Sequence, residues 1–235
     1  MPAAFPSLAL AEAGLNRQHV FNLADLPAAL LAPLGDLSGF RQLILLGHGG
    51  RRLWDCVQAA GMAGEHPIDD YCVATVERIL GPLLPAGGYR LVYPGDAPIG
   101  LQSLGQQAGW HHPTPFMVGI NEEFGTWAAY RAVLLADSDF CPSLPEQHSS
   151  PCTTCLTPPC IAACPAQALA GGVFSLARCS NYRLQANSPC AHGCLARQAC
   201  PVGAQHRYTP AQIAHSYQRS LHWLQAAAQN ASSAG

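Results

Sequence analysis

The sequence contains no lysine at all, because all twelve of its basic residues are arginines. This absence excludes Schiff-base chemistry on a lysine side chain and a phosphate-binding loop that depends on lysine. Charged residues make up only 11% of the chain, and the formal net charge is −2. The chain therefore has no overall positive field for nucleic acid, although a local arginine patch is compatible with this composition. We expect no nucleic-acid partner.

Long apolar runs and a secretory leader are also missing. No apolar run reaches the roughly 18 residues that a membrane-spanning helix needs. The start, MPAAFPSLALAEAG, lacks the basic residues and the long apolar stretch of a secretory signal. We therefore expect a cytoplasmic protein with no membrane partner. In that compartment, eleven cysteines are more typical of metal ligands or redox groups than of disulfides.

The cysteines are concentrated in one part of the chain. Only Cys56 and Cys72 lie in the first 140 residues, and the other nine lie between 141 and 200. The stretch DSDFCPSLPEQHSSP, at the point of this change, is typical of a linker. We therefore predict an α/β domain over 1–140, a cysteine-rich domain over 141–208, and a C-terminal helix and tail over 209–235.

Strand and helix signals alternate in the first of these parts. Apolar runs that end in turn residues predict strands over 40–50, 89–95, 116–121 and 126–137. Helical patterns predict helices over 50–64, 66–84 and 99–110. Mixed elements of this kind favour an α+β or α/β layer fold. Near the C-terminus, Thr209 as N-cap and Pro210 at the first helical position predict a further helix over 209–230.

Eight cysteines form two groups, each of which ends in Cys-Pro. The first is Cys152-x2-Cys155-x4-Cys160-x3-Cys164-Pro165, and the second contains Cys179, Cys190, Cys194 and Cys200-Pro201. In ferredoxins with the run C-x2-C-x2-C-x3-C-P, the fourth cysteine ligates the other cluster of a pair. Applied here, this rule predicts two [4Fe–4S] clusters of the ferredoxin type. One is held by Cys152, Cys155, Cys160 and Cys200, and the other by Cys164, Cys179, Cys190 and Cys194.

Other interpretations of these cysteines stay open. A single cluster or a structural zinc site is possible in principle, but zinc favours two C-x2-C pairs and only one is present. Cys141 is either a bystander or a replacement ligand. Cys56 and Cys72 lie on predicted helix faces and are expected to be small buried hydrophobic residues.

Segments of the first part resemble the CblC-type cobalamin-processing proteins. HPIDDYCVATVERIL and INEEFGTWAAYRAVLL are similar to a helix start and to an F-G-G-W segment followed by an arginine-bearing strand in that family. The corresponding residues include Gly125 and Arg131, and Thr126 replaces the second glycine. The resemblance implies a corrinoid-binding role for Gly125, Thr126 and Arg131. From the residue alone, Arg131 needs a partner, which is a ligand group or an internal acid such as Asp137.

A second resemblance is to epoxyqueuosine reductase and, more distantly, to the reductive dehalogenases. It is carried by DAPIGLQSLGQQAGW, NEEFGTW and LARCSNY, and by the order of a cobalamin-binding domain before two cluster motifs. The resemblance places Asp96 at the catalytic acid of that family, although Asp96 lies two residues before Pro98 where three are expected. The residues alone also allow a turn aspartate. One of the pair His111 and His112 is a candidate cobalt ligand. The alternative is that both only cap the end of a helix.

Together these resemblances imply a nitroreductase-like domain and an iron–sulfur oxidoreductase that uses or reduces cobalamin. Electrons from an external low-potential donor would pass through the clusters to the corrinoid, for cobalamin reduction, removal of its upper ligand, or Co(I)-dependent reduction of a small-molecule substrate. Two alternatives remain. One is a non-catalytic ferredoxin-like electron carrier, and the other is a flavin reductase, because the nitroreductase-like scaffold also holds FMN.

Overall fold

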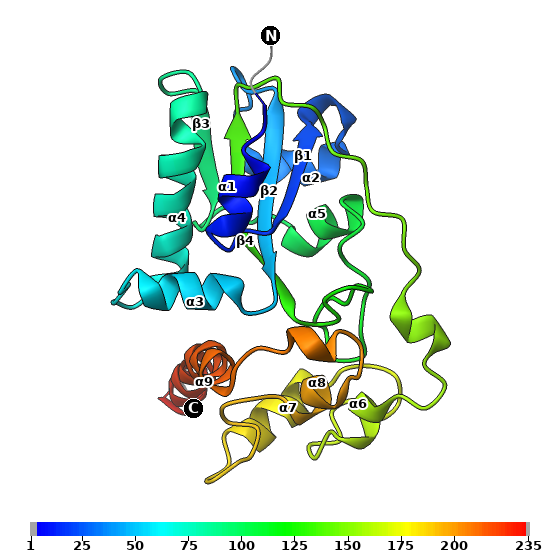
Figure 1. Cartoon of the computed structure of the whole chain (residues 1–235). Coiled ribbons are helices and arrows are strands. Elements are labelled where there is room, and N and C mark those ends of the chain that lie inside the picture. The colour runs from blue at the N-terminus through cyan, green and yellow to red at the C-terminus, as the bar shows by residue number, and fades with distance from the viewer. Residues whose placement is uncertain (1–3, 234–235) are drawn as a thin grey trace. The chain divides into compact units, whose positions relative to one another are not determined.

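The computed structural model describes residues 4–233, and the chain divides into two compact units (Figure 1). Within these residues, unit 1 consists of 4–111 and 128–148, and unit 2 consists of 112–127 and 149–233. The segment 112–127 therefore belongs with the cysteine-rich part of the chain, although it lies between helix and strand residues of unit 1. Between the two parts, residues 137–150 form neither helix nor strand.

A four-stranded antiparallel sheet forms the centre of unit 1 (Figure 1). In spatial order its strands are β1 (Arg17–Asn22), β2 (Gln42–Gly49), β4 (Ala128–Ala136) and β3 (Tyr89–Tyr93). Every residue of β2 is buried, as expected for a central strand whose two faces are both covered. Register shifts at Leu46/Gly47 and at Leu91/Tyr93 show where the pairing of β4 with its two neighbours becomes irregular.

Helices cover both faces of the sheet. Successive residues of β2 point to opposite faces, so they pack into two different apolar clusters. Ile44 and Leu46 pack into one apolar cluster, and Leu43 and Leu45 pack into another. The first cluster includes residues of α1 (Ser7–Glu12), α3 (Arg52–Ala59) and α4 (Pro67–Ile79). The second includes residues of α2 (Ala28–Leu31) and α5 (Leu101–Gln107). Three short 3-10 helices complete the unit: η1 (Leu23–Asp25), η2 (Ala32–Leu34) and η3 (Gly81–Leu83).

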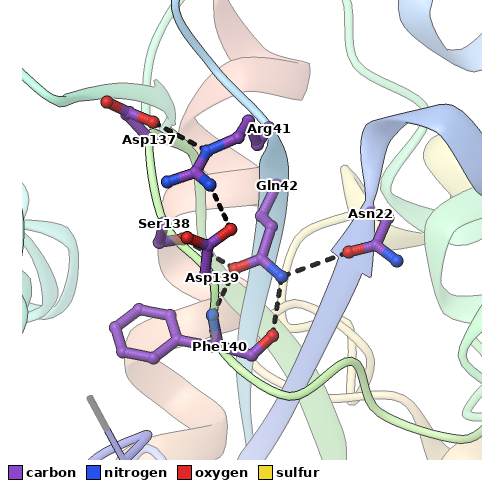
Figure 2. A network of polar contacts seen from close by, with 7 residues as sticks. All are labelled: Asn22, Arg41, Gln42, Asp137, Ser138, Asp139 and Phe140. Atoms are coloured by element: carbon purple, nitrogen blue, oxygen red, sulfur yellow. Dashed lines mark hydrogen bonds and ion pairs between the residues drawn. The ribbon is translucent and has the colours of Figure 1, made fainter. Parts of the chain in front are cut away.

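A buried glutamine fixes the chain where it leaves the sheet (Figure 2). The side-chain amide of Gln42, at the start of β2, donates to the Phe140 carbonyl oxygen at 2.7 Å and to Asn22 Oδ1 at 3.2 Å. Its Oε1 accepts from Ser138 Oγ at 2.7 Å and from the Phe140 amide at 3.0 Å. This one side chain therefore joins the end of β1 to the segment that follows β4.

Unit 2 consists of short helices joined by loops, followed by one long helix. Its elements are η4 (Pro151–Thr154), α6 (Pro159–Ala162), α7 (Leu176–Arg183), α8 (Leu195–Ala199), η5 (Ala204–His206) and α9 (Pro210–Ser233). Its two small apolar clusters centre on Phe116 with Leu169 and on Trp127 with Tyr208. Cysteines pack into the first of these clusters, so the core of this unit contains the residues that the sequence singles out.

Most elements predicted from the sequence are confirmed. The strands expected over 40–50, 89–95 and 126–137 correspond to β2, β3 and β4, and the helices expected over 50–64, 66–84 and 99–110 correspond to α3, α4 and α5. The C-terminal helix begins as expected, since Thr209 Oγ1 accepts a hydrogen bond from the Gln212 amide at 3.1 Å. The mixed α/β character is therefore correct, whereas the ferredoxin-type module stays a prediction.

The strand predicted over 116–121 is wrong. This segment forms only isolated bridges, His112 with Ile120 and Asn121 with Gly125. Met117 has φ +66°, a conformation that an extended strand cannot contain. A strand that the sequence did not indicate, β1, pairs with β2 instead. Within residues 4–233, no helix combines the length and the apolar character needed to cross a bilayer.

Candidate metal centre

The first set of thiols comprises Cys152, Cys155, Cys160 and Cys200. Burial is the main reason why the pKa of the Cys152 thiol is raised, and the thiols of Cys200 and Cys155 raise it further. The pKa of Cys160 is raised by burial first, and then by Cys200, Cys152 and Cys155. Cys200 therefore lies close enough to interact electrostatically with cysteines that precede it by 40 residues or more.

The second set comprises Cys164, Cys179, Cys190 and Cys194. Burial raises the pKa of the Cys179 thiol, and Cys194, Cys164 and Cys190 add to this effect. The pKa of Cys190 is raised by burial first, and Cys194 and Cys164 raise it further. Arg183 acts in the opposite direction on both of these thiols.

A cavity of about 110 Å³ lies among the thiols of the second set. All four of its cysteines line this cavity, together with apolar and aromatic side chains that include Phe116, Val118, Phe174, Tyr182 and Tyr217. Arg183 is the charged residue in the lining. Thiols that converge on one small, largely apolar space are the donor set that an iron–sulfur cluster uses.

Cys164 and Cys200 are the two cysteines that precede proline. Each lies among the cysteines of the other sequence group. Cys164 lines the cavity of the second set, and Cys200 interacts with the first set. The thiols thus fall into the two sets that the sequence suggests, while their binding of iron remains a prediction. Among the residues from 4 to 233, no three His, Cys, Asp or Glu side chains are placed to hold one metal ion.

The remaining three cysteines differ from one another in exposure. Cys141 is exposed, Cys56 is half-buried, and Cys72 is buried. Burial raises the pKa of the Cys72 thiol to about 12. Cys72 lies on the buried side of α4 and packs into the core, as the sequence predicts for a small hydrophobic residue.

Gly125 lies in a tight turn that packs against the loop after Cys200. Its φ is +57°, and a β-carbon at this position would lie 1.9 Å from the carbonyl oxygen of Val202. A β-carbon on Gly203 would likewise lie 2.3 Å from the carbonyl carbon of Phe124. The two glycines therefore allow two backbone segments to approach closely, which explains Gly125 without a corrin ring.

Thr126 and Trp127, the next two residues, contact the side chain of Arg197. Both are 0% exposed. The carbonyl oxygen of Thr126 accepts a 2.5 Å hydrogen bond from Arg197 Nη2, and the Arg197 guanidinium lies 4.5 Å from the centre of the Trp127 ring. The hydroxyl of Thr126 and the indole N–H of Trp127 are buried without a hydrogen-bond partner. Thr126 therefore presents a backbone carbonyl to a neighbouring residue of unit 2.

Arg131 and Asp96 lie in unit 1. Arg131 Nε donates to His48 Nδ1 at 3.0 Å. Asp137, the internal acid that was one alternative for its partner, instead accepts from Arg41 Nε at 2.9 Å (Figure 2). Asp96 is exposed in the turn after β3. The corrin-binding and catalytic roles of these residues stay predictions.

The two histidines that follow Trp110 have different surroundings. His111 is 7% exposed, and its Nδ1 lies 3.1 Å from the hydroxyl of Tyr130. His112 forms a backbone bridge with Ile120. Each is thus held by its own unit, and neither is placed with other candidate ligands among residues 4–233.

Sequence reasoning overlooked three residues at the second set of thiols: Arg183, Arg197 and Tyr217. Burial raises the pKa of Tyr217 to about 12, and the Cys194 thiol adds to this effect. The charges of Arg197 and Arg183 act in the opposite direction on this pKa. The signal in the sequence was the pair of arginines placed among the cysteines, in SNYR and CLARQAC.

Comparison with solved structures identifies the fold. An epoxyqueuosine reductase in complex with an epoxyqueuosine-modified tRNA-Tyr stem loop matches 88% of this chain with a TM-score of 0.55 and 13% identity. The epoxyqueuosine reductase of Bacillus subtilis matches 86% with a TM-score of 0.52 and 15% identity. The chain shares its fold with epoxyqueuosine reductase. At this level of identity the likeness concerns the fold alone.

The chain spans 66% of the length of each of these two reductase structures. A further structure, the B12-trafficking protein CblC of C. elegans, matches 86% of this chain and 85% of its own, with a TM-score of 0.47 and 13% identity. No protein-family model matches the chain, and no curated protein matches it.

Proposed function

We propose that the chain is an iron–sulfur redox protein with two [4Fe–4S] clusters, one held by each set of thiols. The observation that carries this proposal is the cavity lined by Cys164, Cys179, Cys190 and Cys194. Its cysteines come from both sequence groups, which supports the crossed assignment rather than one site for each group. The likeness to the fold of epoxyqueuosine reductase supports a reductase role.

The residues around the cavity fit a cluster in charge and polarity. When bound, a [4Fe–4S] cluster supplies one-electron transfer at low potential. The chain provides the thiolates, and Phe116, Val118 and Phe174 provide an apolar wall that limits access of water. The backbone amide of Arg197 donates to Cys194 Sγ at 3.4 Å, which stabilises negative charge on that sulfur. An external low-potential donor is the implied partner.

We further propose a corrinoid as the electron acceptor, with cobalamin reduction, upper-ligand removal or reduction of a small substrate as the reaction class. The sequence resemblance in the segment from Phe124 to Arg131 supports this part of the proposal. The residues singled out there fit less well than the cysteines do. Val202 occupies the open side of Gly125, and His48 engages Arg131.

These same contacts favour a second candidate, a ferredoxin-like electron carrier without a corrinoid. Gly125, Thr126 and Arg131 each have a structural explanation within their own unit. FMN gains no support from the residues or from the comparisons. The RNA in the reductase complex belongs to that protein, and the absence of a nucleic-acid partner for this chain remains a prediction.

Anaerobic reconstitution followed by titration with hydroxocobalamin tests the proposal and separates its candidates. We expect about eight irons and about eight sulfides per chain, as two [4Fe–4S] clusters require. A stoichiometric shift of the cobalamin bands, and their conversion to those of Co(I) with a low-potential reductant in wild type but not in Cys152→Ala, supports corrinoid reduction. Full iron with the bands of free cobalamin supports the carrier. A chain that takes up no iron contradicts both candidates.

A further inference from the structure

The stretch that follows residue 146, which contains both sets of thiols, has no carboxylate side chain. From residue 147 to residue 235 there is no Asp or Glu, whereas five arginines are present: Arg178, Arg183, Arg197, Arg207 and Arg219. Buried cations normally need a counter-charge, because transfer of a charge out of water is costly. Cluster thiolates are the anionic groups that this stretch itself offers.

Arg183 is built into the wall of the cavity lined by the second set of thiols. Its Nε donates to the Cys190 carbonyl oxygen at 3.2 Å, and its Nη2 donates to the carbonyl oxygens of Ala191 at 3.2 Å and Tyr217 at 3.0 Å. The guanidinium also lies 5.2 Å from the centre of the Tyr217 ring. Three hydrogen bonds to carbonyl oxygens thus hold a positive charge at a fixed position beside the cysteines.

Arg197 adds a second cation near the same set. Only 9% of it is exposed, and its guanidinium lies 4.5 Å from the centre of the Trp127 ring and 5.2 Å from the centre of the Tyr208 ring. Its charge also lowers the pKa of Tyr217, the residue whose ring Arg183 contacts. Tyr217, which lines the cavity, is therefore influenced by both guanidinium groups.

The first set of thiols has different surroundings. Cys152 and Cys160 are influenced by burial, by the other thiols of their set, and by hydrogen bonds from Ser150 and Ile161. Arg183, in contrast, acts on both Cys179 and Cys190 in the second set. The two sets thus differ in the positive charge placed beside them.

We propose that Arg183, assisted by Arg197, makes the cluster of the second set the more easily reduced of the two. This inference rests on the proposed function, because it requires both clusters. On reduction each cluster accepts one electron and changes from the 2+ to the 1+ state, with dithionite as the reductant in the test and no bond made or broken. A fixed nearby cation stabilises the added negative charge, so it raises the reduction potential.

The test is a potentiometric titration of the anaerobically reconstituted full chain, followed by EPR. In Arg183→Gln, the equilibrium constant for reduction of one cluster should fall about tenfold, a shift of about 59 mV for one electron. Arg183→Lys keeps the charge and should lie close to wild type. Arg178→Gln is the matched control, because Arg178 is exposed on the same helix and water screens its charge. If both potentials in Arg183→Gln equal those of wild type, the proposal is wrong.

A second measurement covers the case in which Arg183→Gln loses the second cluster. Cys152→Ala with Cys155→Ala removes the first cluster, and Cys190→Ala with Cys194→Ala removes the second. The cluster left in the first double variant should have the higher potential, and the reverse order overturns the inference. These outcomes are distinct from failure of the proposed function, in which wild type itself takes up no iron and sulfide.

Discussion

Substitution of Gly125 by alanine tests how the turn 121–127 supports the loop after Cys200. The new β-carbon would lie 1.9 Å from the Val202 carbonyl oxygen, and Gly125 has φ +57°. Alanine at such a φ costs about 1–2 kcal/mol. Forcing extra volume into a packed site costs about 1–3 kcal/mol more. We therefore expect Gly125→Ala to lower the free energy of unfolding by about 2–5 kcal/mol.

The matched control for this substitution is Gly171→Ala. Gly171 has φ +88° in the same unit, but a β-carbon there would have no atom within 4 Å. It therefore carries the conformational cost without the collision, and the two variants should differ by about 1–3 kcal/mol. For a urea slope of about 2 kcal/mol/M, this corresponds to a difference of about 0.5–1.5 M between their unfolding midpoints, measured by circular dichroism.

The same pair of variants should also differ in iron content. Because the collision displaces Val202, two residues from Cys200, Gly125→Ala should retain less iron after reconstitution than Gly171→Ala does. Equal midpoints and equal iron in the two variants would falsify the close packing of Gly125 against the loop that contains Val202 and Gly203.

Three further outcomes are expected. His19 is 2% exposed, and burial, followed by the charge of Arg17, lowers its pKa to about 4. As the pH falls, the unfolded chain therefore binds this proton before the folded chain does. The free energy of unfolding is unaffected above about pH 6.5, falls as the pH drops, and levels off near pH 4, a loss of about 3 kcal/mol. Urea unfolding at pH 7.5 and 5.0 should show a smaller difference in His19→Gln than in wild type, whereas exposed His222→Gln should behave like wild type. Iodoacetamide should modify exposed Cys141 in the folded protein and leave buried Cys72 unmodified until urea is added, and equal labelling rates would contradict the burial of Cys72. Finally, Cys141→Ser should keep the full iron content, and a loss of about half the iron would make Cys141 a ligand.

The fold could be predicted where apolar periodicity and end signals agree. β2 and β4 are mostly apolar segments, and α9 has both Thr209 and Pro210 at its start. β1 was missed because Arg17 and His19 are buried at positions where apolar residues were expected. The segment 116–121 was misassigned because its apolar composition does not reveal the positive φ of Met117. Local pattern cannot anticipate such tertiary contacts.

The candidate site shows the same division. The two sets of thiols could be deduced from spacing and from the two Cys-Pro pairs, because ligand spacing is a local property of the sequence. The role of Gly125 could not, since the Val202 carbonyl that excludes a β-carbon lies about eighty residues later and is brought there by folding. Arg183 and Arg197 were overlooked for a similar reason: their contacts with Tyr217 and Trp127 join distant parts of unit 2.

The crossed assignment of the cysteines is the central claim, and one double variant tests it most directly. In Cys164→Ala combined with Cys190→Ala, both lost ligands belong to the second set, so the first cluster should remain. We expect about four irons per chain after anaerobic reconstitution, together with the EPR signal of one reduced cluster. Cys160→Ala with Cys190→Ala, which removes a ligand from each set, should retain almost none. If the Cys164 and Cys190 double variant also retains almost no iron, each sequence group holds its own cluster and the crossed assignment is contradicted.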